Sequence, residues 1–509
     1  MIKKIIADVN AFEARVALLE DGEPAEIHVE TRGKERLVGN IYKGRVANIL
    51  PGMQAAFIDI GLEKNAFLYA GDILSDQSDF YFSEMQDEEA IEKKLELPNI
   101  KEMLVPNQEI MVQVLKQPGG SKGARVTTHI TLPNRYLVLM PTVDHVGVSR
   151  RIGNEEERER LKDIITEIKP SGMGVIARTV AENATREELE AELRFALRLW
   201  ERVSGKADFL TSPRLIHAEE TLLFRTVRDL LTDEVEEFVI NDKDYYDKLL
   251  AVINIVSPGM EGKLKLFRGN GNIYDFYNIE DKIERALKRK VWLKSGCCLV
   301  IDETEALTVV DVNTGKYIGE DNLQDTILNA NIEAAHEIAR QLRLRDISGI
   351  IVIDFIDMES VENRKKVVEA LAEAVKRDRT KSNILGMTEL GLVEMTRKKM
   401  RRKLSALMQV ACPTCCGAGR VYSLDTMAMR LRREVIRTVE DKSQNTYLVE
   451  VDNALAQFVT EKNNQNTALL PQYEHARLYI KGSDALNPEH IEISLVTEKG
   501  KLNGAQVFC

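Results

Sequence analysis

The sequence lacks any long hydrophobic run. No apolar stretch among the 509 residues approaches the roughly 20 residues that a membrane-spanning helix needs. The N-terminal segment meets Asp8 before a signal-peptide core can form. We therefore expect a cytoplasmic protein with no stable membrane insertion.

Cysteine is also scarce, with six residues in the chain. A chain of this length can bury several hydrophobic cores, so it needs no disulfide framework. Cys297 and Cys298 run into the apolar segment 299–301 and are expected to be packing residues. The spacing of Cys412 and Cys415 has a different meaning, treated below.

The chain has no excess of positive charge. Its 70 Lys and Arg against 81 Asp and Glu give a net charge of -11, which argues against a protein that coats nucleic acid through its overall field. Basic residues nevertheless cluster at 285–290 and 397–403, so a local RNA site stays open. The acidic stretch 76–92 is expected to be a solvated insertion without direct function.

Long repeats and low-complexity tails are absent too, and the length suggests three or four structural units. The pattern predicts a multidomain α/β protein. Five short strands with glycine corners over 37–132 suit a β-barrel such as an OB-fold. Thr185 and Glu188 predict a capping box for a helix to about Arg202. Strands and helices alternate over 279–400, and 421–509 is a small α/β or helical appendage.

Two strands of the 279–400 region end in carboxylates. Side chains alternate along a strand, so Asp311 and Asn313 should share one face. Asp354 ends the run 349–353, and ligand sites gather at the carboxyl ends of strands in α/β sheets. Asp311 and Asp354 could thus reach one Mg²⁺, which prefers few carboxylates. The alternative is that these Asp and Asn residues are ordinary turn residues at strand ends. Asp357 is expected to face away from Asp354 and to be structural.

An apolar stripe predicts the helix between these strands, from about Leu323 to Leu344. His336 lies on this helix and is expected to be a surface or packing residue.

Four motifs together resemble the ribonuclease E/G family of bacterial endoribonucleases. They are Asp311-Val312-Asn313-Thr314-Gly315, the stretch 340–346 (RQLRLRD), the stretch 351–358 (IVIDFIDM) and Cys412-Pro413-Thr414-Cys415. The resemblance covers nearly the whole chain. The chain ends soon after the catalytic part, as in the shorter, ribonuclease G-like form of the family.

The resemblance implies a reaction and its residues. Asp311, Asn313 and Asp354 would be catalytic, with Asp311 and Asp354 binding Mg²⁺. The implied activity is cleavage of single-stranded A/U-rich RNA, leaving a 5′-phosphate and a 3′-hydroxyl, in rRNA maturation and mRNA decay. The alternative is a non-catalytic RNA-binding scaffold, and the presence of Asp311, Asn313 and Asp354 argues against it.

The resemblance also implies the domain plan. An RNase H-like subdomain (1–36 and 213–278) carries an inserted OB-fold (37–132, the S-one type) and a 5′-phosphate sensor region (133–212). A DNase I-like catalytic subdomain (279–400), a zinc link (401–420) and a small C-terminal domain (421–509) follow.

Further residues match the family's RNA contacts. Phe57, Phe67 and Lys122 would bind unpaired RNA, although Phe57 could instead be a core aromatic. Arg178 and Thr179 match the pocket for a 5′-monophosphate. Some relatives place an Arg behind this pocket where this chain has Lys381, and we expect the point charge to loosen it.

Cys412 and Cys415 supply two zinc ligands, whereas a structural zinc takes four. The chain has no second CxxC, and Cys416 is too close in sequence to complete the tetrahedron. The simplest solution is a homodimer that shares one Zn²⁺ between two chains, and the resemblance implies the same. Whether dimers pair into a homotetramer stays open. A redox CxxC would lack its usual thioredoxin-like βαβ surroundings.

Overall fold

A computed structural model describes residues 2–33, 36–73, 99–118, 122–257, 259–316, 323–439, 445–464, 469–496 and 506–507. The chain divides into two compact units, Met1–Leu407 and Met408–Cys509. The acidic stretch 76–92 lies largely outside the described residues, so its interpretation stays a prediction. Among the helices that are described, none has both the length and the apolar character needed to cross a membrane.

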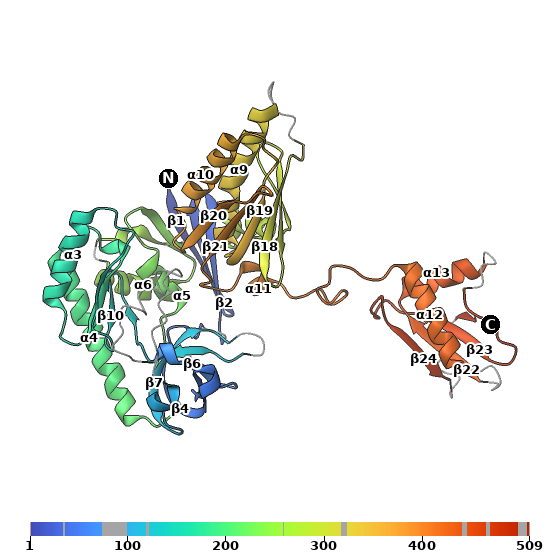
Figure 1. The fold of residues 1–509 in the computed structure, drawn as a ribbon, viewed down its shortest axis with the longest axis horizontal. Coiled ribbons are helices and arrows are strands. Elements are labelled where there is room, and N and C mark those ends of the chain that lie inside the picture. Colours follow the sequence, from blue (N-terminus) through green and yellow to red (C-terminus); the bar gives the residue numbers. More distant parts are fainter. Residues whose placement is uncertain are drawn as a thin grey trace. The chain divides into compact units, whose positions relative to one another are not determined.

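The first sheet of the larger unit has the order β15-β14-β1-β2-β3, and its strands β1 and β2 are labelled in Figure 1. Its strands are β1 (Lys3–Val9), β2 (Glu13–Glu20), β3 (Glu23–Thr31), β14 (Val235–Ile240) and β15 (Leu264–Leu266). Strands β1 and β2 form an antiparallel hairpin, and β3 continues it. Both faces are buried, under α5 (Leu222–Asp229) and α6 (Lys243–Val256) on one side and α7 (Ile273–Phe276) and α8 (Ile279–Ala286) on the other. Burial on both faces explains the continuous apolar runs of these strands.

A closed barrel of five strands follows, as the glycine corners predicted. Its strands are β4 (Ile41–Leu50), β5 (Ala55–Asp59), β6 (Ala66–Tyr69), β7 (Glu109–Lys116) and β8 (Arg125–Thr127). Strand β4 pairs with both β5 and β7, which closes the barrel. The sheet also takes in a strand from much later in the sequence, β13 (Arg214–His217), which pairs with β4.

A four-stranded sheet with two helices comes next. It contains β9 (Leu132–Pro133), β10 (Leu137–Met140), β11 (Val146–Val148) and β12 (Gly174–Ala177), with α3 (Glu155–Ile168) and α4 (Arg186–Phe209). The capping box of Thr185 and Glu188 is confirmed at the start of α4, which continues past the expected end. The two helices and the sheet enclose one core.

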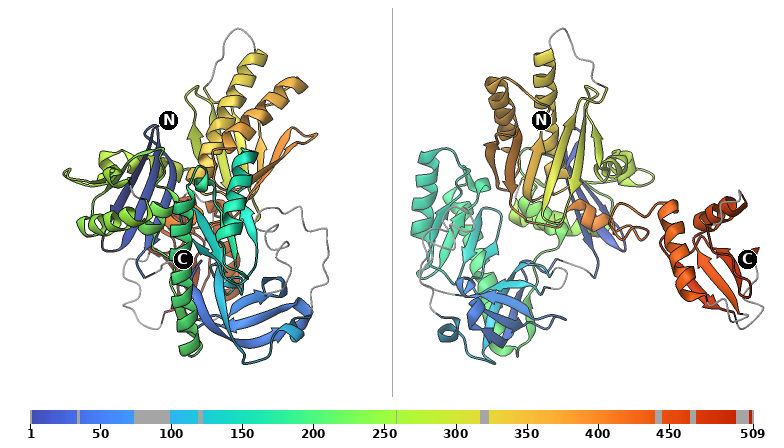
Figure 2. Two further views of the ribbon diagram at one scale, coloured as in Figure 1. Left: turned by 90° about the vertical axis from the view of Figure 1, so that its left-hand side faces the viewer. Right: turned by 45° about the vertical axis from the view of Figure 1, so that its right-hand side comes forward.

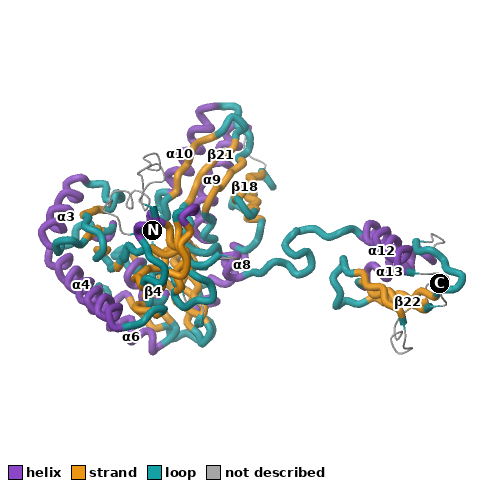
Figure 3. The backbone as a smooth tube through the Cα atoms, turned by 60° about the horizontal axis from the view of Figure 1, so that its bottom comes forward, coloured by secondary structure: helices purple, strands orange, loops and turns teal. Residues whose placement is uncertain are grey.

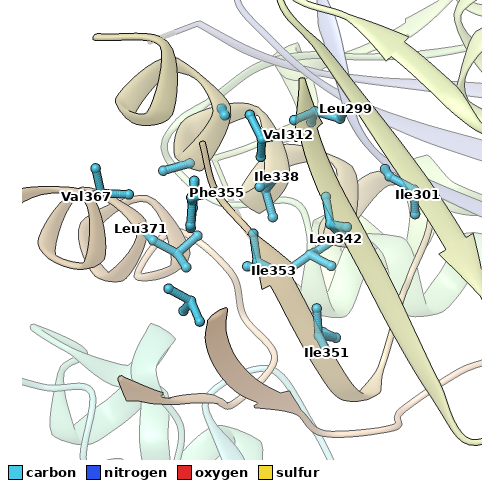
Figure 4. Packing of buried hydrophobic residues seen from close by; sticks show 14 of the residues in the cluster. Leu299, Ile301, Val312, Ile338, Leu342, Ile351, Ile353, Phe355, Val367 and Leu371 are labelled. Atoms are coloured by element: carbon cyan, nitrogen blue, oxygen red, sulfur yellow. The ribbon is translucent and has the colours of Figure 1, made fainter. Parts of the chain in front are cut away.

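The last sheet of the larger unit has the order β16-β17-β18-β19-β21-β20. Its strands are β16 (Lys290–Trp292), β17 (Cys298–Glu303), β18 (Leu307–Asn313), β19 (Gly349–Asp354), β20 (Ser382–Met387) and β21 (Leu392–Arg397). Helices α9 (Leu323–Leu344) and α10 (Val361–Val375) pack on one face, where the core residues of Figure 4 interdigitate. The limits predicted for α9 are confirmed, and His336 lies exposed on it. The other face carries the functional candidates.

The smaller unit is an α/β structure, one of the two forms expected. Its sheet has the order β24-β22-β23-β25, and α12 and α13 lie along it (Figures 2 and 3). The elements are α12 (Leu424–Thr438), β22 (Thr446–Val451), α13 (Asn453–Asn464), β23 (Arg477–Gly482), β24 (Ile491–Leu495) and β25 (Gln506–Val507). The smaller unit has a hydrophobic core of its own. The domain limits inferred from the family resemblance stay predictions.

Candidate active site and RNA-contacting residues

The two carboxylate-ending strands are neighbours in the sheet. Strands β18 and β19 run parallel, and Asp311 and Asp354 are direct partners in their register. The crossover between them is α9, which packs its apolar stripe under the sheet. Because partners in register point to the same side, both carboxylates stand on the face opposite α9 and α10. The expected approach of Asp311 and Asp354 is therefore found, while their catalytic role stays a prediction.

Asn313 joins this pair at the end of β18. Its side-chain Nδ2 donates a hydrogen bond of 2.8 Å to Oδ2 of Asp311, as the shared face predicted. The bond orients the Asp311 carboxylate and leaves its other oxygen available. It also fixes the Asn313 amide so that its oxygen points away from Asp311.

Asp357 follows this pair in the chain, three residues after Asp354. Strand β19 ends at Asp354, so strand alternation does not define the side on which Asp357 lies, and its structural role stays a prediction. Asp357 is exposed. Partial burial raises the pKa of Asp354, and the negative charges of Asp311 and Asp357 raise it further.

This concentration of negative charge fits a divalent cation. Among the described residues, no group of three or more His, Cys, Asp or Glu side chains forms a ready metal cluster. Magnesium needs no such cluster, because it keeps several waters and takes one or two carboxylates plus substrate phosphate oxygens. Asp311 and Asp354 fit that role, with Asn313 beside them.

The barrel presents two aromatic side chains side by side. Phe57 and Phe67 are cross-strand partners on β5 and β6. Their rings meet edge to face, with centroids 6.1 Å apart and planes at 72°. Both are only partly buried, and neither belongs to the barrel core, which takes the alternating residues Ala56, Ile58, Ala66 and Leu68. The alternative that Phe57 is a core aromatic is therefore wrong.

Lys122 lies close to this aromatic pair along the barrel surface. It is exposed, and the next residue, Gly123, approaches β6 so closely that any side chain there would collide with the carbonyl of Asn65. Phe67 in turn donates its backbone N–H to Ala124 at 2.7 Å. The three candidate RNA-contacting residues thus come from adjoining segments of one barrel.

Arg178 follows β12, where its guanidinium meets two acceptors. Nη1 donates to the carbonyl of Asn134 at 2.6 Å, and Nη2 pairs with Asp229 at 2.8 Å. Burial opposes the ionisation of Asp229, but Arg228 and Arg178 outweigh it and lower its pKa. Thr179 is exposed, and its hydroxyl lies 2.9 Å from that of Ser149. An arginine so fixed has a defined orientation beside an accessible hydroxyl.

The loop 378–381, which leads into β20, reaches the segment that carries Asp229. Arg379 donates to the carbonyl of Asp229 at 2.7 Å, and Arg151 donates to the carbonyl of Arg379 at 2.6 Å. Lys381 is exposed two residues further on. Asp229 therefore links the Arg178 segment to the segment that carries Lys381. Sequence reasoning missed Asp229 and Arg379, since neither stands in a recognisable motif.

A buried ionic cluster fixes that loop, and sequence reasoning missed it as well. Arg397, at the end of β21, donates to Asp378 at 2.6 Å and to Asp346 at 2.7 Å. It also donates to the carbonyl of Ile347 at 2.9 Å and to the hydroxyl of Thr380 at 3.3 Å. Asp346 is the last residue of the 340–346 motif, and this motif was the only sign of the cluster in the sequence. The motif thus contributes an acceptor for a buried arginine.

The CxxC segment lies in the smaller unit. Hydrogen bonds from the backbone of Cys415 and Thr414 lower the pKa of Cys412, which is exposed. The backbone N–H of Gly419 donates to the sulfur of Cys415 at 3.3 Å, and Cys416 turns its thiol towards the carbonyl of Pro413. The two sulfurs of this turn could serve as a pair of zinc ligands, which would leave two positions of a tetrahedron open. Cys297 and Cys298 are buried, which confirms them as packing residues.

Comparisons with known proteins agree with this arrangement. The profile of the Ribonuclease E/G family matches residues 131–400. The chain is 42% identical to Ribonuclease G of Haemophilus influenzae over 493 residues, 96% of this chain and 99% of that protein. It is 40% identical to Ribonuclease G of Escherichia coli over 496 residues, 97% of this chain and 100% of the relative. Ribonuclease E of Escherichia coli is 34% identical over 505 residues, 98% of this chain but 46% of that protein. The chain therefore belongs to the ribonuclease E/G family of endoribonucleases.

Proposed function

We propose that this endoribonuclease depends on Mg²⁺, cleaves single-stranded A/U-rich RNA in the cytoplasm and prefers a 5′-monophosphorylated end. Its targets would be rRNA precursors and mRNA. The observation that carries the proposal is the register of Asp311 and Asp354 on neighbouring parallel strands. The alternative of a non-catalytic scaffold has no support, since the chain is similar to endoribonucleases over nearly its whole length.

Each residue has a defined task in this proposal. Asp311 and Asp354 would hold the ion, and the hydrogen bond from Asn313 keeps the Asp311 carboxylate in one orientation. The bound ion would supply charge neutralisation at the scissile phosphate and a more acidic water. Phe57 and Phe67 offer partly exposed rings for stacking on unpaired bases, which contributes about 1–3 kcal/mol per base.

Two further proposals concern the RNA end and the assembly. Arg178, Thr179 and Lys381 would bind the terminal 5′-phosphate, because a guanidinium and a hydroxyl match its oxygens. Cys412 and Cys415 of two chains would share one Zn²⁺ and hold a homodimer, which could pair further into a homotetramer.

The central test is Asp354→Asn, assayed on an unpaired A/U-rich oligonucleotide. Cleavage should be lost while RNA affinity stays within about twofold, because the substitution removes a metal ligand and leaves the barrel intact. Titration calorimetry should show weaker Mg²⁺ binding. Asp247→Asn changes an exposed aspartate on α6 and serves as the matched control. Retained Mg²⁺-dependent turnover in the Asp354 variant would remove this residue from the catalytic role.

A further inference from the structure

An exposed tryptophan lies on the same face as the acidic site. Trp292 ends β16, the edge strand of the catalytic sheet, and 52% of its surface is exposed. It is the direct partner of Cys298 on β17, and Cys298 is the direct partner of Asn313 on β18. Partners in register point to the same side, so Trp292 and Asn313 stand on one face, two strands apart. Two strand spacings place their backbones about 10 Å from each other.

The indole ring is held towards the end of β18. A side-chain carbon added at Gly315 would come within 3.2 Å of Cζ3 of Trp292 and 2.5 Å of the carbonyl of Gly296. Gly315 follows Asn313 by two residues, and its φ of 58° suits a residue without a side chain. The backbone that leaves the acidic site therefore passes close beside the ring.

Two lysines flank this ring. Nζ of Lys290 lies 4.2 Å from the ring centroid, and Nζ of Lys316 lies 5.9 Å from it. Lys290 is also aligned with Asp311 across the sheet, through Val300. A half-exposed indole with two ammonium groups close to its ring offers a single strand both a stacking surface for a base and cations for the neighbouring phosphates. A protein partner would be a poorer match, since charged lysines are depleted from interface cores.

Resting on the proposed function, we infer that Trp292 stacks on one RNA base next to the scissile bond, while Lys290 and Lys316 contact the adjoining phosphates. This stacking platform, formed by Trp292 with Lys290 and Lys316, lies on the sheet that carries Asp311 and Asp354. It is separate from the aromatic pair of the barrel. It would position the scissile phosphate over the carboxylates, so its effect should depend on the presence of a base at one position of the substrate.

An oligonucleotide with one mapped cleavage bond tests this, with an abasic residue moved through it one position at a time. The wild type should lose about five- to a hundredfold in kcat/KM at one position beside the scissile bond. Trp292→Ala should lose a similar factor in kcat/KM on the intact substrate. Removing the base at that position should then cause no further loss in this variant. Trp292→Phe should recover most of the rate. Phe209→Ala removes an even more exposed aromatic side chain, at the end of α4, and should match the wild type.

Fluorescence separates this inference from the proposed function. The chain has two tryptophans, so Trp200→Phe leaves Trp292 as the sole emitter. Combined with Asp354→Asn, it should show saturable quenching by unpaired RNA, with smaller quenching when the critical base is absent. Absence of cleavage in the wild type would refute the proposed function and leave this quenching unaffected. If Trp292→Ala loses the same factor at every abasic position, the role of Trp292 is structural. If the variant has a changed mass in light scattering, Trp292 contacts a protein. Either result would overturn the RNA-stacking role.

Discussion

Arg397 offers the sharpest test of how the larger unit is held together. It is 4% exposed, and its partners Asp378 and Asp346 are 6% and 9% exposed. The guanidinium makes hydrogen bonds to both carboxylates, to the carbonyl of Ile347 and to the hydroxyl of Thr380. Arg397→Met keeps the approximate volume but leaves two buried carboxylates without their cation.

Removing one partner from a buried ionic group costs about 3–5 kcal/mol. Here the lower end applies, because both acids keep some support. Asp378 still accepts the backbone N–H of Thr380 at 2.8 Å, and Nε of Arg401 stays 3.5 Å from Asp346. We therefore expect a loss of about 3 kcal/mol in the free energy of unfolding of the larger unit.

Urea unfolding followed by tryptophan fluorescence measures this loss, since both tryptophans lie in the larger unit. Arg186→Met, which breaks ion pairs on the exposed surface of α4, should leave the midpoint nearly unchanged. Adding Asp346→Asn and Asp378→Asn to the Arg397 variant should restore part of the stability by removing the stranded charges. A loss below about 1 kcal/mol, or no recovery in the triple variant, would refute the reasoning.

Three other predictions address the assembly, pH dependence and substrate choice. The wild type should carry about half a zinc per chain, and Cys412→Ser with Cys415→Ser should release it and shift light scattering towards monomer; one zinc per chain would exclude a shared site. Burial raises the pKa of Glu192 from 4.5 to about 7. Between these two pH values the carboxyl group stays protonated in the folded chain, whereas the unfolded chain has already released the proton. Stability should therefore fall by at most about 3 kcal/mol as pH rises through that window and then level off, whereas Glu192→Gln should show no such fall in thermal unfolding. Arg178→Ala should bring cleavage of a 5′-monophosphorylated RNA down by roughly ten- to a hundredfold, to the level of its 5′-hydroxyl counterpart, chiefly through KM; equal losses on both RNAs would mean a structural role.

Local patterns predicted the sheet that carries Asp311 and Asp354 well. The alternation along β18 placed Asp311 and Asn313 on one face, and their hydrogen bond confirms this. The apolar stripe gave the limits of α9, because helix packing imposes its own period on the sequence. These features depend on a few consecutive residues, so the sequence carries them directly.

Features that depend on distant pairing were missed. Strand β13 has four residues, two of which are charged or polar, and only its partner β4 makes it part of the barrel sheet. Asp378 and Arg397 are separated by 19 positions, and no periodicity connects them.

Trp292 illustrates the same limit at the site itself. It stands in a strand of three residues, too short for alternation to assign it a face. Its position beside Asn313 follows from two successive strand pairings, β16 with β17 and β17 with β18. A local pattern can assign Asp311 to a face of its own strand, but the register of the sheet decides which other side chains share that face. Residues that act on the substrate from neighbouring strands therefore become recognisable only once the pairing is known, even where the acidic residues are plain in the sequence.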